Sequence, residues 1–138
     1  MNRQMSEIVR NRKPVTMAPE ATVKQARAAM HEQRIGAVLV ERDGMLVGIF
    51  TGRDAVRCLA RGTDPEGTRL AEVMTQQPCC MGPGATAIEA LRLMHDGGFR
   101  HVPVIENGRA VGIVSTGDFR GLEHDRLDEE TGLWERIG

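Results

Sequence analysis

The chain has 138 residues, of which 41% are hydrophobic and only 3% are aromatic, and its formal net charge is −1. This length suits one compact domain, or two small halves that share a core. The near-neutral charge and the scarcity of aromatic residues argue against a nucleic-acid-binding protein, which normally shows a basic stripe or aromatic stacking residues.

The cysteines and the N-terminal segment exclude further classes. The three cysteines have no C-x-x-C spacing and the four histidines do not complete a set of zinc ligands, so we expect no metal site. Residues 1–13 are largely polar and lack the apolar stretch of a signal peptide, and no run reaches the length of a membrane span. We therefore expect a cytoplasmic protein that does not bind a membrane.

The main organisational feature of the sequence is an internal repeat. Residues 14–58 align with residues 78–122 without a gap. A match over such a length is typical of two copies of one supersecondary unit. The identical pairs include Pro14/Pro78, Met17/Met81, Thr22/Thr86, Met30/Met94, Val38/Val102, Gly48/Gly112 and Asp54/Asp118.

In chain order, each copy first predicts a short strand and then a helix. Thr22 and Thr86 are expected N-caps, because Gln25 and Glu89 follow them at the spacing of a capping box. Apolar residues then recur with helical periodicity and indicate one buried face. They are Val23, Ala26, Ala29 and Met30 in the first copy, and Ile88, Leu91 and Met94 in the second, behind short strands near Val15 and Cys79.

A hairpin and a second helix follow in each copy. Short apolar runs at 37–40 and 102–105 lead into Asp-Gly or Asn-Gly, the dipeptides that favour tight hairpin turns. Return strands are expected at 46–50 and 110–114, and a second helix begins near Asp54 or Asp118. The predicted order in each copy is strand, helix, strand, strand, helix.

This pattern predicts an α+β (α/β) fold in which two repeats pack against each other. One copy is too small to bury its own apolar faces. We place the first repeat and the N-terminal segment at 1–64, the second repeat at 65–122, and a charged C-terminal tail at 123–138. Residues 61–70, which contain Gly62, Pro65 and Gly67, are the expected linker.

Three motifs identify the family that the repeats resemble. They are the lead-in Val73-Met74-Thr75-x-x-Pro78, the strand Arg100-His101-x-Pro103-Val104, and the exit Gly112-Ile113-Val114-Ser115-x-x-Asp118, which recurs as Gly48-Ile49-Phe50-Thr51-x-x-Asp54. In this order and in duplicate, they resemble the CBS family, named for its occurrence in cystathionine β-synthase. The resemblance covers about residues 9–122. It implies tandem β-α-β-β-α repeats, packed as an intramolecular pseudo-twofold pair with two symmetry-related clefts.

The resemblance also implies an adenosyl ligand in these clefts: AMP, ADP, ATP, NAD or S-adenosylmethionine. Asp118 and Asp54 then accept hydrogen bonds from the ribose diol. Hydroxyls and backbone N–H groups at the helix N-terminus, together with arginines, suit phosphate. The expected phosphate ligands are Ser115, Thr116, Thr51, Arg100 and Arg53. The expected base contacts are Val15, Thr16, Ile35, Ala37, Cys80, Met81, Phe99 and His101.

The two clefts are not expected to be equivalent. Where the second copy has Arg100-His101, the first has Gly36-Ala37, and Arg53 stands where the second copy has a glycine. We therefore expect the cleft with Asp118 to be the better nucleotide site, with its phosphate reached by Arg100 or Arg53. The alternative for both aspartates is a purely structural role as helix N-caps.

The function favoured by these residues is a nucleotide-binding sensor, not an enzyme, that acts through an unidentified regulated protein. The sequence has no nucleophile–base pair, P-loop or dinucleotide-binding motif. The alternatives are a structural dimerisation module with empty clefts and a weak nucleotide-processing enzyme. The resemblance implies a homodimer formed through helices. Further candidates for that contact are Met5, Ile8 and Val9 at the N-terminus and Leu127, Leu133, Trp134 and Ile137 in the tail.

Overall fold

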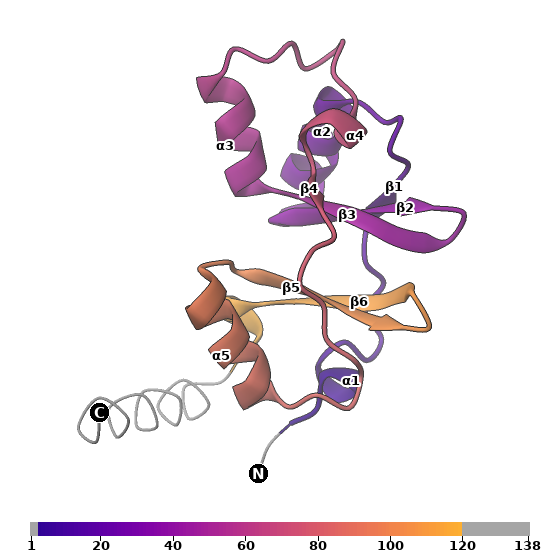
Figure 1. Cartoon of the computed structure of the whole chain (residues 1–138), viewed down its shortest axis with the longest axis vertical. Coiled ribbons are helices and arrows are strands. Elements are labelled where there is room, and N and C mark those ends of the chain that lie inside the picture. Colours follow the sequence, from indigo (N-terminus) through magenta and orange to yellow (C-terminus); the bar gives the residue numbers. More distant parts are fainter. Residues whose placement is uncertain (1–2, 120–138) are drawn as a thin grey trace, which may run out of the picture.

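A computed structural model describes residues 3–119 of the chain. It has two halves stacked along the long axis of the molecule (Figure 1), each with a sheet toward the middle and helices on the outside. This is the α+β arrangement of two repeats that the sequence predicts, and the predicted fold class is confirmed. None of the helices in the described part of the chain is long and apolar enough to cross a membrane.

The first half has a four-stranded sheet in the order β1-β2-β3-β4. Strand β1 is parallel to β2, whereas β3 is antiparallel to both of its neighbours. The order strand, helix, strand, strand, helix predicted for this copy is therefore confirmed. The elements are β1 (Thr16–Met17), α2 (Val23–Gln33), β2 (Ala37–Arg42), β3 (Met45–Thr51), α3 (Gly52–Ala60) and β4 (Thr75–Gln76).

The second half repeats this pattern around an antiparallel pair of strands, β5 and β6. The strand expected near Cys79 is reduced to a parallel bridge between Met81 and Val104. A short 3₁₀ helix begins after β6, and the continuation of the second helix expected there lies outside the described residues. The elements are α5 (Ala87–Gly97), β5 (His101–Glu106), β6 (Arg109–Ser115) and η1 (Thr116–Asp118).

Local chemistry accounts for the ends of the helices. The Oγ1 of Thr22 accepts the backbone N–H of Gln25 at 3.1 Å, and the Gln25 side chain accepts the backbone N–H of Thr22 at 2.9 Å. Thr86 and Glu89 form the same reciprocal pair in the second copy. Both predicted capping boxes are confirmed, and they fix where α2 and α5 begin.

The two hairpin turns also follow from their residues. Asp43 and Gly44 have φ values of 53° and 78°, and Asn107 and Gly108 have φ values of 54° and 78°. Two successive residues with positive φ form the turn whose twist matches that of the flanking strands. The Asp-Gly and Asn-Gly dipeptides therefore set the register of β2 on β3 and of β5 on β6.

A reciprocal exchange of short helices links the two halves. Helix α1 (Met5–Ile8) precedes the first repeat but packs in the core of the second, where Met5 is 0% exposed. Helix α4 (Leu70–Val73) leads into the second repeat but places Leu70 in the core of the first. The backbone N–H of Met5 donates to the carbonyl of Ala85 at 2.8 Å, and that of Leu70 donates to the carbonyl of Ala21 at 2.8 Å.

Two glycines make room for these exchanged segments. A Cβ at Gly112 of β6 would lie 2.5 Å from the Cβ of Val9, which follows α1. A Cβ at Gly48, the corresponding position of β3, would lie 2.5 Å from the Sδ of Met74, which follows α4. Real Cβ atoms do not approach so closely. Both strands therefore need glycine where the segment that precedes the other repeat crosses them.

The exchange corrects one expectation about the N-terminus. Met5, Ile8 and Val9 were candidates for a contact between chains, but they are at most 6% exposed and lie inside the second core. The lead-in helix completes that core because the repeat alone leaves one side of α5 and its sheet uncovered. The tail residues proposed for the same contact lie outside the described residues.

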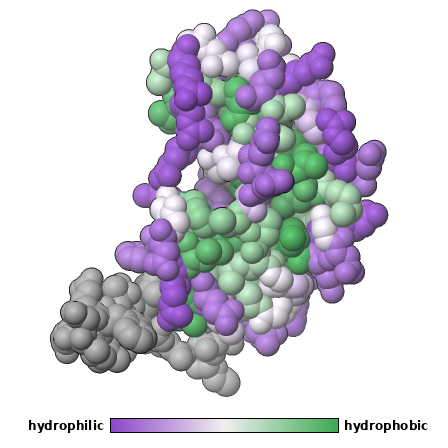
Figure 2. Space-filling model, in the orientation of Figure 1, coloured by the Kyte–Doolittle hydropathy of each residue, from purple (hydrophilic) through white to green (hydrophobic). Residues whose placement is uncertain are grey.

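The two sheets meet through a third, smaller apolar cluster. It contains Ala37, Leu39 and Ile49 of the first sheet, with Ala110 and Ile113 of the second packed against them. Figure 2 shows apolar residues extending through the middle of this face of the molecule, with polar residues around them. The halves therefore share buried surface, and clefts remain at the edges of the contact, where the strands end.

Candidate functional site

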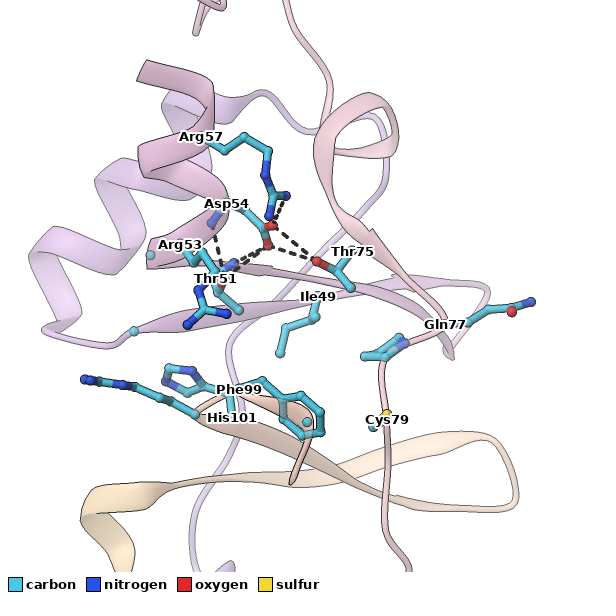
Figure 3. Close-up of a pocket in the computed structure, with 15 residues that line it drawn as sticks. Ile49, Thr51, Arg53, Asp54, Arg57, Thr75, Gln77, Cys79, Phe99 and His101 are labelled. Carbon is cyan, nitrogen blue, oxygen red and sulfur yellow. Dashed lines mark hydrogen bonds and ion pairs between the residues drawn. The ribbon is translucent and has the colours of Figure 1, made fainter. Parts of the chain in front are cut away.

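A cleft between the two halves, named here the Asp54 cavity, has a volume of about 630 Å³. It lies between the end of β3, the start of α3 and the residues before β5. Figure 3 shows Phe99 and His101 of the second half facing Ile49 and Thr51 of the first half across it. Its lining also includes Gly36, Arg53, Asp54, Arg57, Thr75, Gln77, Cys79 and Arg100.

The carboxylate of Asp54 is buried and extensively hydrogen-bonded (Figure 3). Its side chain is 2% exposed. One oxygen accepts from the backbone N–H and the Oγ1 of Thr51 at 2.9 and 3.1 Å. The other accepts from Nη1 of Arg57 at 2.9 Å and from Oγ1 of Thr75 at 3.2 Å. The buried charge is thus compensated by an ion pair and by hydrogen bonds.

The aspartates are not themselves the N-caps of the helices. Thr51 is the N-cap of α3, and Asp54 is the third helical residue of a capping box. In the second copy, Ser115 precedes η1 and its backbone N–H donates to Asp118 Oδ2 at 2.7 Å. The alternative that the aspartates are helix N-caps is therefore wrong in detail. Thr51 and Ser115 are the N-caps, and each aspartate is the third helical residue, whose carboxylate accepts the N-cap backbone N–H.

The second cleft, the Asp118 cavity, has a volume of about 340 Å³. Asp118 pairs with Nη1 of Arg12 at 2.7 Å, and the two side chains are 19% and 49% exposed. Asp118 is therefore more accessible than Asp54, and its charge partner is a surface side chain. The cavity is lined by residues of the first repeat's lead-in and strand ends, including Lys13, Val15, Arg34, Ile35 and Ala37, and by Ile113 and Ser115.

Each cavity combines residues from both repeats. The carboxylate and the hydroxyl come from the strand–helix junction of one repeat, and the opposite wall comes from the lead-in and the helix–strand junction of the other. This pairing relocates the two arginines expected near Asp118. Arg53 and Arg100 both line the Asp54 cavity, where Arg53 donates to the carbonyl of Gly98 at 2.9 Å. The cations of the Asp118 cavity are Arg12, Lys13 and Arg34.

His101 forms a wall between the two cavities and lines both. It lies over Gly36, where a Cβ would be 2.7 Å from its Nε2. Burial lowers the pKa of His101 below its ordinary value, Asp118 acts in the opposite direction, and Arg100 lowers it further. At neutral pH the His101 ring is therefore mainly neutral. Its position over Gly36 requires that this residue carry no side chain.

The structure brings together most of the residues expected from the sequence, although their roles as ligand contacts stay predictions. Val15, Ile35, Ala37 and Ser115 line the Asp118 cavity, and Thr51 and Phe99 line the Asp54 cavity. Four others line neither. Thr16 lies in β1, Met81 packs on the second core, Thr116 begins η1, and the thiol of Cys80 donates to the carbonyl of Pro78 at 3.1 Å.

Several lining residues were not anticipated as site residues. Thr75 and Arg57 hold the Asp54 carboxylate, while Arg12 holds Asp118. Thr75 belongs to the motif Val73-Met74-Thr75-x-x-Pro78, and this motif could have marked it as a site residue in the sequence. Arg12 and Arg57 look like ordinary surface arginines in sequence. In residues 3–119, no three histidine, cysteine, aspartate or glutamate side chains gather where they could hold a metal ion.

Comparison with known proteins matches the repeats to one family. The family model of the CBS domain matches residues 5–61 of this chain and, a second time, residues 70–125. The chain is 34% identical over 104 residues to the CBS domain-containing protein YhcV of Bacillus subtilis, covering 75% of this chain and 74% of YhcV. It is 39% identical over 104 residues to the CBS domain-containing protein CBSCBSPB2 of Arabidopsis thaliana, covering 74% of this chain but 19% of that protein.

Solved structures of CBS pairs share the fold. The CBS domain protein PAE2072 of Pyrobaculum aerophilum, complexed with AMP, matches with a TM-score of 0.82 and 22% identity. That match covers 92% of this chain and 99% of PAE2072. The CBS domain pair of protein MJ0100, in complex with 5′-methylthioadenosine and S-adenosyl-L-methionine, matches with a TM-score of 0.78 and 22% identity, covering 95% of this chain and 99% of the other.

Proposed function

Because this chain belongs to the CBS domain family, we propose that it is a regulatory module that binds an adenine nucleotide or a related adenosyl ligand without transforming it. The observation that carries this proposal is the duplicated site. In two separate cavities, a carboxylate stands beside a hydroxyl at a strand–helix junction, opposite apolar residues and cations of the other repeat. A protein that needed these aspartates only to cap helices would not need cavities beside both.

The residues of the Asp118 cavity suit the three parts of such a ligand. Asp118 accepts hydrogen bonds from the ribose hydroxyls, which replace its exposed contact with Arg12. Adenine lies against the apolar side chains of Val15 and Ile35. Ser115 and the cations of this cavity, Arg12, Lys13 and Arg34, face the phosphate end.

The Asp54 cavity is larger, but its carboxylate is less available. A ribose can reach Asp54 only if Arg57 or Thr75 gives up its hydrogen bond, because the carboxylate is 2% exposed. Removing a partner from a buried carboxylate costs free energy unless the ligand replaces it. We therefore propose that the Asp118 cavity fills first and the Asp54 cavity fills at higher ligand concentration.

Two structural neighbours support the ligand class. PAE2072 is complexed with AMP, and MJ0100 is in complex with 5′-methylthioadenosine and S-adenosyl-L-methionine. Their ligands share an adenosyl group and differ beyond the ribose. We propose that ligand binding in this chain changes its fit to a regulated protein, and no nucleophile held by a base is found among the described residues that line either cavity.

Calorimetric titration tests the proposal. AMP, ATP, NAD and S-adenosylmethionine are titrated separately into the wild-type protein, the Asp118→Ala variant and the Asp96→Ala variant. Asp96 is exposed on α5 and lines neither cavity, so its replacement controls for the loss of one carboxylate. We expect saturable binding that Asp118→Ala weakens and Asp96→Ala leaves unchanged. No binding by any of the four compounds would refute the sensor and favour a structural module.

We also propose that two chains assemble through α3. Val56 and Leu59 are 65% and 67% exposed, three residues apart on that helix. Neighbouring apolar side chains at this spacing form a stripe that a second copy can cover. Light scattering at micromolar concentration should give the mass of a dimer, and Val56→Glu should reduce it to that of a monomer. A monomeric wild-type protein would contradict this assembly.

A further inference from the structure

Both cavities carry an excess of positive charge. Arg53, Arg57 and Arg100 line the Asp54 cavity, and Asp54 is the only carboxylate among the described residues that do so. In each cavity one arginine pairs with the carboxylate: Arg57 with Asp54 at 2.9 Å, and Arg12 with Asp118 at 2.7 Å. The remaining cations of each cavity are therefore available to a ligand.

The Asp118 cavity repeats this imbalance with different residues. Its cations are Arg12, Lys13 and Arg34, and Asp118 is the only carboxylate that the described part of its lining contains. No carboxylate within residues 3–119 forms an ion pair with Lys13 or Arg34. The same holds for Arg100, and for Arg53, whose recorded partner is the neutral carbonyl of Gly98.

These charges come from non-equivalent positions. Arg53 corresponds to Gly117 in the second repeat, and Arg100 corresponds to Gly36 in the first. The two cavities thus reach the same balance without copying the same cations. His101, which lies between them, adds little positive charge at neutral pH because burial lowers its pKa.

From this balance we infer that both cavities select adenosyl ligands bearing several phosphate charges, and reject neutral or cationic ones. The inference rests on the proposed function and specifies its ligand. The adenine and ribose ends of all candidate ligands are the same, so discrimination depends on the end that faces the cations. A di- or triphosphate places negative charge there and 5′-methylthioadenosine places none, whereas the sulfonium, ammonium and carboxylate of S-adenosylmethionine together place a net positive charge.

Separate calorimetric titrations of four ligands test whether the cavities prefer phosphate-bearing ligands. ATP, AMP, adenosine and S-adenosylmethionine are titrated into the wild-type protein at low and high salt. We expect ATP to bind more tightly than AMP, adenosine to bind weakly, and S-adenosylmethionine to bind weakest. Raising the salt concentration should weaken ATP binding much more than adenosine binding, because salt screens charges at partly exposed sites.

Charge-removing variants assign the effect to each cavity. Arg53→Gln with Arg100→Gln removes two cations from the Asp54 cavity, and Lys13→Gln with Arg34→Gln removes two from the Asp118 cavity. All four side chains are exposed, so the melting temperature should not change. Each double variant should weaken ATP binding at its own cavity by about tenfold or more, and leave adenosine binding unchanged.

The control for these variants is Arg61→Gln, an exposed arginine outside both cavities, which should leave ATP binding unchanged.

The possible outcomes distinguish the failure of this inference from the failure of the proposed function. Tighter binding of S-adenosylmethionine or adenosine than of ATP would overturn the inference while the proposed function stands. So would ATP binding that neither double variant weakens. Failure of these four compounds and of NAD to bind would overturn the proposed function, and the inference with it.

Discussion

The docking of α1 in the second core predicts a large effect of one substitution near the N-terminus, Met5→Ala. Met5 is fully buried among the apolar residues of the second core, including Leu91 and Val104. Truncation removes most of its side chain from a site whose walls belong to α5 and its sheet. Because those elements are held by their own backbone hydrogen bonds, the gap should close only in part.

The expected cost follows from this burial. Replacing a fully buried methionine with alanine destabilises a protein by roughly 2–5 kcal/mol. Domains of this size are stable by roughly 5–15 kcal/mol in total, so the loss is a large share of the whole. Met45→Ala is the matched control, because it is the same substitution at a side chain that is 41% exposed. Its cost should stay within about 0.5 kcal/mol.

Urea unfolding of both variants measures the difference, and native-state hydrogen exchange shows where it acts. In Met5→Ala, protection should fall most in α5 and β5, since these elements lose the side chain that covers them. Equal midpoints for Met5→Ala and Met45→Ala would refute the reasoning. So would a loss of protection confined to α2 and β2, which would place α1 on the wrong half.

Three further changes test other parts of the structure. Gly112→Ala should destabilise the protein by roughly 1–3 kcal/mol in thermal unfolding, and adding Val9→Ala should recover part of the loss because it removes the two Val9 methyl carbons, 2.6 and 3.0 Å from the added Cβ, although the Val9 Cβ at 2.5 Å remains. Burial lowers the pKa of His101, so the unfolded chain binds more protons below about pH 6.5 and the unfolding free energy falls there as pH decreases; His101→Gln should reduce this slope. Thr86→Ala should cost about 1 kcal/mol by chemical denaturation, and an unchanged midpoint would contradict the observed capping box.

The parts of the fold that depend on local chemistry could be predicted from the sequence. The capping box at Thr86 and the turn at Asn107 each involve residues within a few positions of one another. Their preferences are therefore visible in short stretches of chain. The ungapped repeat then carried these local elements into a complete architecture.

The partner of each lead-in helix could not be predicted in this way. The spacing of Met5, Ile8 and Val9 indicates an apolar face, but periodicity does not identify the surface that covers it. The same limit displaced Arg53 and Arg100, which the sequence associated with Asp118 and the structure places beside Asp54. An alignment of two repeats relates equivalent positions, whereas a cavity between them combines non-equivalent ones.

The exchange of α1 and α4 has a consequence for how such a chain is built. The unit that is duplicated in the sequence is not the unit that folds, because each core contains a helix from the other copy. In a symmetric dimer of single repeats, this arrangement would be a domain swap. Residues 61–67 join two swapped copies into one chain, and cleavage there would leave two fragments held together by noncovalent contacts alone. Each fragment would still carry the helix that completes its partner.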